Sequence, residues 1–236
     1  MNMLKRITQW STLLGMAFVS TAHVASAAMV PYVESFSADA ANWEDSVNNP
    51  LSYVATGGAD GDGYASGAFN YNGYSSPFGG GPVVFRASAS DGASGGAFVG
   101  DWLADGVGTI SAFVRHDAPE ALSFFMRVAT PANFPGAVIS STISVLPNTW
   151  TEISWVVDPS NPFCFPEGGT CASALSSVGN FQIGTNAPVG LTDDDFAYTL
   201  DVDVVSILPI PEPGTALLMV LGLAGLATVR DEGRIG

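Results

Sequence analysis

Short runs in which every second residue is hydrophobic cover the middle of the chain. Residues 121–129 show the pattern well, with hydrophobic side chains at Leu122, Phe124, Met126 and Val128. A period of two is typical of half-buried β-strands. The same alternation, or a short apolar run between turns, predicts further strands at 30–36, 51–56, 63–70, 83–89, 108–117, 137–145, 149–157, 178–185 and 197–208.

Turn-forming residues separate these runs. Pro119 and Pro147 lie between neighbouring strands, and the glycine- and aspartate-rich segment 57–63 is unsuited to any regular element. About ten short strands without a long helix predict an all-β domain in which two antiparallel sheets pack as a sandwich. A jelly roll fits better than an immunoglobulin-like sandwich, because Cys164 and Cys171 are too close in sequence to bridge two sheets.

The N-terminus has the layout of an export signal. A basic start and an apolar run at 13–19 precede the small residues Ala25 and Ala27. This layout predicts a signal helix over residues 1–27, cut after Ala27 by signal peptidase, so that the mature chain begins at Ala28. A membrane-spanning anchor is the alternative, and the apolar run is too short for it. Residues 28–208 then form a single domain.

The C-terminal segment 209–236 has three parts. A polar motif comes first, an apolar helix is predicted over 216–229, and charged residues end the chain. At about 1.5 Å per residue, this helix is short against a hydrocarbon core of about 30 Å. It therefore suits transient membrane anchoring better than permanent anchoring. The residues that define the outer two parts are Pro211, Glu212, Pro213, Arg230 and Arg234.

This three-part layout resembles the PEP-CTERM sorting signal. The resemblance implies that an exosortase, an integral membrane enzyme, recognises and removes the tail. It also implies transient anchoring in the inner membrane and then delivery to the cell surface or extracellular matrix of a Gram-negative bacterium. The tail departs from the family in one respect: Asp231 and Glu232 stand where the family usually has a run of Arg or Lys. The cytoplasmic stop signal is weaker for that reason.

Acidic residues dominate the charge. Asp and Glu number 22 against 7 Lys and Arg, for a formal net charge of −15. Between residues 28 and 208 the cationic side chains are Arg86, Arg115 and Arg127, and there is no lysine. A surface this acidic repels nucleic acid and anionic lipid, which excludes both as partners. It is compatible with calcium and with neutral polymers.

The two cysteines flank a turn. Cys164 and Cys171 enclose Pro-Glu-Gly-Gly, and in an exported protein this arrangement predicts a local disulfide. Half of a zinc site is the rival interpretation. It is disfavoured because the chain has no other cysteine and His116 is the only histidine after the signal peptide. His116 is also the only candidate base for a nucleophilic triad, and its place at the end of a predicted strand disfavours catalysis.

The domain itself resembles the laminin-B and galactose-binding-like jelly rolls. The segments that carry the resemblance are 34–39 with Trp43, the glycine-rich 56–64, 98–102, 150–153 and 203–207. Many members of that group are carbohydrate-binding modules, and many hold a structural calcium between the first and last strands. The resemblance implies that Glu34 and Asp203 would share such an ion. The acidic loops 60–63 and 193–195 are alternative calcium sites, although a solvated turn explains each of them as well.

Tyr64, Tyr71 and Tyr74 lie among Gly, Asn and Ser residues. This context is typical of aromatic rings on which sugars stack, although ordinary strand and turn aromatics are the alternative. We therefore expect an exported, non-enzymatic surface or matrix protein that binds extracellular polysaccharide. That binding rests on fold resemblance, a weak warrant for function. The alternative function is a secreted hydrolase of matrix polysaccharide, which would need a cleft with two facing carboxylates.

Overall fold

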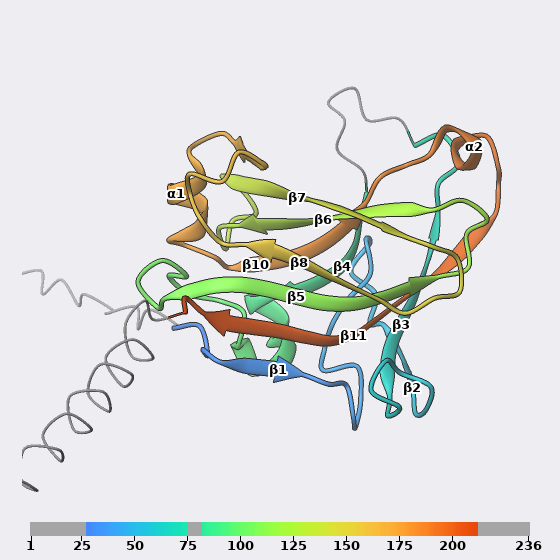
Figure 1. Ribbon diagram of the computed structural model, residues 1–236, viewed down its shortest axis with the longest axis horizontal. Helices are drawn as coiled ribbons and strands as arrows, with labels where there is room; N and C mark the ends of the chain where they lie inside the picture. The colour runs from blue at the N-terminus through green and yellow to red at the C-terminus, as the bar shows by residue number, and fades with distance from the viewer. Residues whose placement is uncertain (1–26, 75–81, 212–236) are drawn as a thin grey trace, which may run out of the picture.

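The computed structural model describes residues 27–74 and 82–211. These residues form a two-layer sandwich of antiparallel β-sheets (Figure 1), as the alternating pattern predicts. The helices predicted at the two ends lie outside the described residues. The strands are β1 (Tyr32–Glu34), β2 (Ser52–Val54), β3 (Tyr64–Asn70), β4 (Val83–Ser88), β5 (Val107–His116), β6 (Leu122–Ala129), β7 (Gly136–Val145), β8 (Thr151–Val156), β9 (Cys164–Glu167), β10 (Asn180–Thr185) and β11 (Ala197–Pro209).

The helical elements of the described residues are short. They are η1 (Ala89–Asp91), η2 (Ala93–Gly96), α1 (Cys171–Leu175) and α2 (Val189–Thr192). Within these ranges no helix has the length and apolar character needed to cross a bilayer.

Two sheets make up the sandwich. Sheet A has the order β2-β3-β11-β5-β8, with β1 also paired to β11, and sheet B has the order β4-β10-β6-β7-β9. The long strand β11 pairs with β3 through its first half and with β1 through Val205–Ile207. A bulge separates the two halves at Asp203 and Val204, where Val204 takes a φ of 45°. At this bulge Asp203 accepts a hydrogen bond from the backbone N–H of Ala59, in the loop 57–63.

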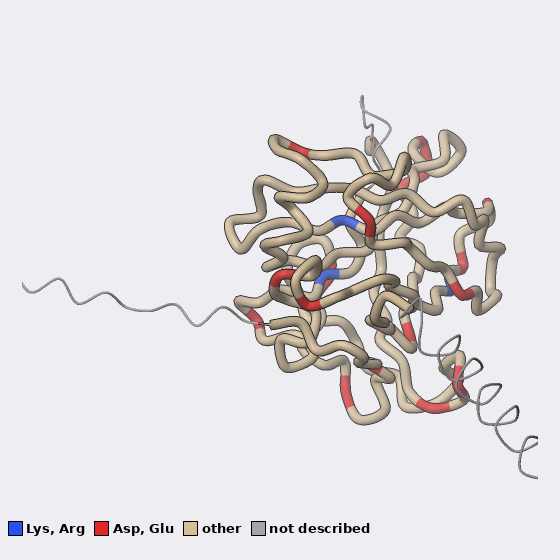
Figure 2. The backbone as a smooth tube through the Cα atoms, turned by 60° about the vertical axis from the view of Figure 1, so that its left-hand side comes forward, with Lys and Arg blue, Asp and Glu red and all other residues tan. Residues whose placement is uncertain are grey.

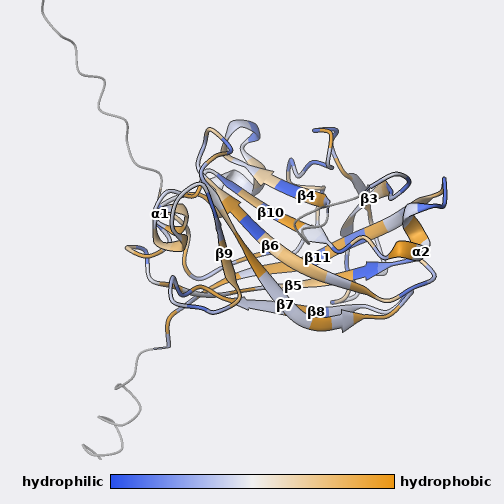
Figure 3. Cartoon of the chain, turned by 90° about the horizontal axis from the view of Figure 1, so that it is seen from above, coloured by the Kyte–Doolittle hydropathy of each residue, from blue (hydrophilic) through white to orange (hydrophobic). Residues whose placement is uncertain are grey.

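The core lies between the sheets. The alternating residues of β6 predicted to face inward, Leu122, Phe124, Met126 and Val128, are buried, and Figure 3 shows that this strand is mostly hydrophobic, with a hydrophilic band across it. Other aromatic side chains surround Trp43 in the core. The ring centroids of Phe36, Phe98 and Phe181 lie 5.5, 5.7 and 5.8 Å from that of Trp43, each nearly perpendicular to it. Such edge-to-face pairs add to the stability that burial alone provides.

One strand, β9, was not predicted from the sequence pattern. β9 pairs only with β7 and contains Pro166, so it cannot show a regular run of strand-forming residues. Proline is tolerated there because β9 is the edge of sheet B, where one side of the strand needs no ladder hydrogen bonds.

Acidic and basic residues occupy different parts of the domain. Figure 2 shows the Asp and Glu residues spread widely around the domain, many of them on loops. The arginines Arg86, Arg115 and Arg127 instead lie within the strands β4, β5 and β6. The few positive charges are therefore held by regular structure, while most of the negative charge is at the periphery.

Candidate functional site

A row of five side chains crosses all five strands of sheet B on its outer face. The register places Arg86 of β4 opposite Gln182 of β10, and Gln182 opposite Arg127 of β6. Arg127 in turn lies opposite Val138 of β7, which lies opposite Phe165 of β9. Residues directly opposite each other on neighbouring strands point to the same face and lie within contact distance. Two of the three arginines therefore meet on one surface.

A groove lies over three residues of this row, Arg86, Arg127 and Val138, with a cavity volume of about 380 Å³. Such a volume lies within the usual range for ligand sites, about 300–1,000 Å³. Sheet B contributes the arginines together with Phe125 and Glu167, and the chain near the end of β3 contributes aromatic rings. The full lining is Ser46, Val47, Phe69, Tyr74, Pro82, Val83, Arg86, Phe125, Arg127, Val138 and Glu167.

Gly184 makes room for one wall of the groove. A Cβ atom built at Gly184 would collide with the ring of Phe125 and would approach the carbonyl oxygen of Pro82 to 2.6 Å. Gly184 lies opposite Phe125 in the register of β10 and β6. The missing side chain lets the ring lie against the sheet, where it is 8% exposed. Any larger residue at 184 would push the ring away and change the shape of the groove.

Arg127 is held in place by four hydrogen bonds. Its Nε donates to Glu167 Oε2 at 2.8 Å, and its Nη1 donates to Asn133 Oδ1 at 2.9 Å and to Gln182 Oε1 at 2.7 Å. Its Nη2 donates to the carbonyl oxygen of Asn133 at 3.1 Å. Gln182 is only 2% exposed and the Arg127 side chain 14%, so this network is partly shielded from water. Arg127 thus builds the groove floor and has few donors left for a ligand.

Arg86 is differently placed. Its Nε is buried without a hydrogen-bond partner among the described residues, and its Nη1 reaches Asn48 Oδ1 only at 3.4 Å. A buried donor left unpaired costs about 1–3 kcal/mol. The long bond to Asn48 is the side-chain hydrogen bond of the terminal nitrogens of Arg86 among the described residues, so these nitrogens, rather than the buried Nε, are the donors that a bound molecule could use.

The three tyrosines predicted to form one aromatic platform lie in three different places. Tyr74 lines the groove, with its ring 6.2 Å from that of Phe69, and partial burial raises its pKa. Tyr71 is 0% exposed and its hydroxyl oxygen lies 2.7 Å from Thr185 Oγ1, so the prediction of a surface role for Tyr71 is wrong. Tyr64 lies on the outer face of sheet A, because β3 belongs to that sheet.

On sheet A, the ring faces of Tyr64 are occupied. Its ring packs edge-to-face against Trp150 at 5.4 Å, and the guanidinium of Arg115 lies 4.9 Å from the Tyr64 ring and 4.5 Å from the Trp150 ring. Arg115 is fixed by Asp201, which accepts hydrogen bonds at 2.9 and 2.8 Å. The cation already stacks on both rings, which leaves less ring surface for a sugar than in the groove of sheet B.

The carboxylates predicted to share calcium each have their own partners. Glu34 accepts hydrogen bonds from the Phe36 N–H and the Tyr32 hydroxyl, both at 3.0 Å. Asp203 is 0% exposed and accepts from the backbone N–H groups of Ala59 and Val204 at 2.7 and 2.8 Å. Within 27–74 and 82–211, no three Asp, Glu, His or Cys side chains gather as a metal site would require. These residues do not fit a preformed calcium cage, and calcium binding stays a prediction.

Thermal unfolding tests that prediction. A calcium ion bound only by the folded state would stabilise it by roughly RT ln(1 + [Ca]/Kd). The midpoint temperature of unfolding would therefore be higher in 2 mM calcium than in chelator. Asp203→Asn is expected to remove the difference, whereas Asp158→Asn, in an exposed turn away from Glu34 and Asp203, is the matched control. Equal midpoints of the unaltered protein with calcium and with chelator would contradict a calcium site.

The buried Asp203 also makes stability depend on pH. Burial, and secondarily the charge of Asp60, raises the pKa of Asp203 to about 6, against an ordinary value of 3.8. The folded state therefore binds the proton more tightly than the unfolded state. The resulting stabilisation is complete below about pH 4 and is lost as the pH rises through 6. In the unaltered protein we expect the free energy of unfolding to fall by about 1–3 kcal/mol between these limits, and in Asp203→Asn we expect no such fall. Urea unfolding in chelator measures both. A pH profile that the substitution leaves unchanged would contradict this.

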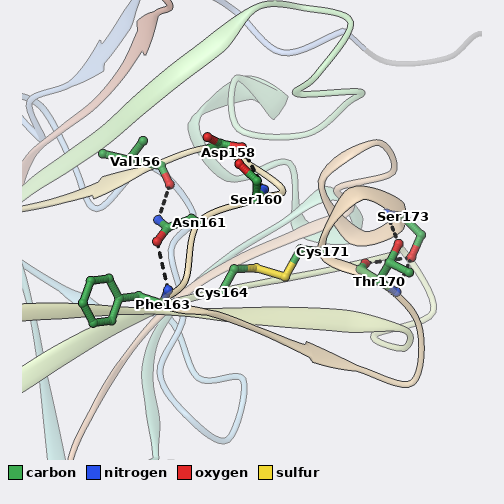
Figure 4. Close-up of a disulfide and its surroundings, with 9 residues drawn as sticks. All are labelled: Val156, Asp158, Ser160, Asn161, Phe163, Cys164, Thr170, Cys171 and Ser173. Carbon is green, nitrogen blue, oxygen red and sulfur yellow. Dashed lines mark hydrogen bonds between the residues drawn. A yellow bond between two sulfur atoms is a disulfide. The ribbon is translucent and has the colours of Figure 1, made fainter.

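The predicted disulfide is confirmed. Cys164 and Cys171 are bonded, with their Cα atoms 6.4 Å apart, and join β9 to α1 (Figure 4). Their pairing also excludes the zinc interpretation. His116 is 1% exposed, and one ring nitrogen, Nε2, lies 3.0 Å from the carbonyl oxygen of Val145. Burial lowers the pKa of His116, which fits a neutral core histidine better than a catalytic base.

The residues of the two processing signals are placed only in part. Ala27, Ala28 and Pro211 lie at the ends of the described ranges, and the backbone N–H of Ala28 donates to Asp105 Oδ2 at 2.8 Å. The other predicted signal residues lie outside those ranges: Ala25, Glu212, Pro213, Arg230 and Arg234.

Sequence reasoning missed most of the groove. From the sequence, Arg86 and Arg127 counted only toward the charge balance, and neither Gln182 nor Phe125 was predicted as a site residue. The available signal was that Arg127 takes an outward position in a strand whose other side is entirely hydrophobic. A charged residue at such a position shows which face of the strand meets water, but the strand alone does not show what lies beside it.

No family model matches the chain, and no curated protein matches it. Solved structures do match, with 16 chains found. One holds the CBM22-1 and GH10 modules of endo-1,4-β-D-xylanase 10B from Clostridium thermocellum complexed with xylohexaose; it is 17% identical, with a TM-score of 0.46, and the match covers 77% of this chain and 29% of that one.

Two single modules also match. The CBM22-1 xylan-binding domain of Xyn10C from Paenibacillus barcinonensis is 13% identical, with a TM-score of 0.44, over 79% of this chain and 98% of that one. The family 11 carbohydrate-binding module of cellulase Lic26A-Cel5E from Clostridium thermocellum is 12% identical, with a TM-score of 0.42, over 78% and 97%. Identities this low do not transfer a function, which has to be inferred from the groove itself.

Proposed function

We propose that the domain binds a neutral polysaccharide in the groove on the outer face of sheet B. The observation that supports this most is the combination, in one open groove, of the planar polar side chain of Arg86 with the rings of Tyr74 and Phe125. A sugar ring presents hydroxyl groups at its edge and C–H groups on its faces. Polar groups that fix orientation beside aromatic surfaces are suited to both.

The charges around the groove favour a neutral ligand. Arg127 is paired with Glu167, and the carboxylate of Asp45, beside the lining residue Ser46, feels the charge of Arg86. The domain as a whole is strongly acidic, so a polyanion would be repelled on approach. The free donors of Arg86 can bind the hydroxyl oxygens of a neutral sugar without overcoming that repulsion.

The same groove is less suited to the alternative function, a hydrolase. Glycoside hydrolysis commonly needs an acid and a second carboxylate on opposite sides of the bond that is cleaved. Among the described residues that line the groove, Glu167 is the one carboxylate, and it is bound to Arg127. We therefore favour binding without cleavage.

A glycan array and a polysaccharide pull-down with the purified protein test the proposal. We expect binding to at least one neutral polysaccharide, with no release of reducing ends during long incubation. An absence of binding with or without calcium would contradict it, and steady release of reducing ends would favour the hydrolase.

We further propose that the protein is exported through its N-terminal signal and sorted through residues 209–236. The contact between Ala28 and Asp105 is compatible with this route. Cleavage after Ala27 would place a new α-amino group beside the Asp105 carboxylate, and opposite charges there would favour the folded N-terminus. The product would then reach the cell surface or matrix, where a polysaccharide is available.

Glu212→Ala tests the sorting proposal. We expect the variant to accumulate as a longer form in the membrane fraction, because the exosortase would no longer recognise the motif, and immunoblots of cell fractions would show it. Glu152→Ala, which changes an exposed glutamate of β8, is the matched control and should be processed normally. Release of Glu212→Ala at the level of the unaltered protein would rule the signal out.

A further inference from the structure

A second cavity lies between β7 and β8. Its volume is about 500 Å³, and it shares no lining residue with the groove of sheet B. β8 is the last strand of sheet A, and β9 covers β7 only along Gly136–Ile139. The rest of β7 therefore faces β8 without a strand between them. The lining is Ser140, Ser141, Thr142, Ile143, Ser154, Trp155, Val156, Asp158, Ser160, Asn161, Pro162 and Phe163.

The chemistry of this cavity is neutral and rich in hydroxyl groups. Ser140, Thr142 and Ser154 make no side-chain hydrogen bond with other described residues, so their hydroxyls are available. Among the described residues that line the cavity there is no lysine or arginine, which disfavours phosphate, sulfate or uronate groups. The side chain of Phe163 is 48% exposed and that of Val156 is 58% exposed. A ligand with hydroxyl groups and apolar C–H faces suits this mixture better than a wholly apolar one.

The loop that forms one side of the cavity is fixed in advance (Figure 4). The Asn161 side chain donates to the carbonyl oxygen of Val156 at 3.0 Å and accepts from the Phe163 N–H at 2.9 Å. Asp158, the carboxylate of the cavity, accepts from the N–H and hydroxyl of Ser160 at 2.8 and 2.7 Å. The disulfide at Cys164 anchors the loop directly after Phe163. A site that is ordered before binding loses less conformational entropy when it binds.

Trp155 adds a buried donor to the same wall. The residue is 2% exposed, and its indole N–H has no acceptor among the residues that the structure describes. An unpaired buried donor of this kind is destabilising.

We infer that the cavity between β7 and β8 is a second saccharide site, which takes a neutral sugar segment against Phe163 with its hydroxyl groups toward Ser140, Thr142 and Ser154. The inference rests on the proposed function for its ligand class, but on none of the groove residues. A single domain would then hold two saccharide sites on different parts of its surface.

Calorimetric titration of the full chain with cellohexaose, xylohexaose and laminarihexaose tests the inference. Three variants are compared with the unaltered protein: Arg86→Ala with Tyr74→Ala for the groove, Phe163→Ala with Ser154→Tyr for the cavity, and Phe196→Ala as a control that removes another half-exposed ring. Circular dichroism confirms that each variant is folded. We expect the groove variant to keep binding at a stoichiometry near one. In a fourth variant, which combines the groove and cavity substitutions, we expect that remaining affinity to fall at least tenfold.

The outcomes separate the two ideas. If the groove variant lost all binding while the cavity variant bound as the unaltered protein does, the second site would be overturned and the proposed function would remain intact. Binding that is lost only in the cavity variant would overturn the groove as the site of the proposed function and support the cavity. No binding of the three probes to any form would overturn the second site, and the glycan array would then decide the proposed function.

Discussion

Trp43→Ala is expected to lower the free energy of unfolding by about 3–5 kcal/mol, the usual cost of removing a buried tryptophan. The side chain is 0% exposed and packs against Phe36, Phe98 and Phe181. Its indole Nε1 donates to the buried Ser94 hydroxyl at 2.8 Å. Alanine would leave a cavity between the sheets and a buried hydroxyl without its donor.

Urea unfolding followed by circular dichroism measures this effect. Trp150→Ala is the control, because that tryptophan is only partly buried, on the outer face of sheet A, and its Nε1 bonds to the carbonyl oxygen of Gly57 at 3.0 Å. We expect the control to cost about 1 kcal/mol, near the average for point mutations. Similar losses in the two variants would mean that the aromatic cluster around Trp43 does not dominate the core.

The second large effect is expected on ligand binding. Arg86→Ala should weaken binding of a neutral polysaccharide by about 10- to 100-fold, because hydrogen bonds to a charged group contribute about 1.5–3 kcal/mol. The strand should remain paired, since Arg86 makes its strand and bridge contacts through the backbone. Tyr74→Ala should add a further loss by removing a ring from the groove wall.

Binding to the polysaccharide selected by the array, measured by calorimetry, checks this result. Tyr53→Ala is the matched control for Tyr74→Ala, because it removes a 37% exposed tyrosine from β2 of sheet A. We expect the control to bind as the unaltered protein does. Normal affinity in Arg86→Ala, with the fold intact, would show that the ligand does not use this groove.

The strands of the middle of the chain could be predicted because each carries its own evidence. In β5 and β6 the alternation is regular, since one side of each strand meets the core and the other meets solvent. β9 could not be found in this way. It is four residues long and forms because β7 pairs with it, and the paired residues are 25 to 31 positions apart in the sequence, from Ile139 with Cys164 to Gly136 with Glu167.

In the candidate site, the difference between what local sequence predicts and what the fold decides is larger. Tyr71 and Tyr74 are three residues apart, yet one is in the core and the other lines the groove. Their local sequence is alike, and the difference arises from how the chain leaves β3 and meets Thr185. The pairing of Arg86 with Gln182 depends on a register between strands that are distant in sequence. No local pattern contains that register.

The amino-acid sequence by itself determined the all-β class, the short disulfide loop and the acidic surface, because each depends on residues that are neighbours or on composition alone. It also carries the two terminal signals, whose action stays a prediction. Only the tertiary structure decided that two arginines, a glutamine and a phenylalanine from separate strands share one face. The physical reason is that a sheet aligns side chains across strands by backbone hydrogen bonding, so a surface of this kind exists only once the strands have paired.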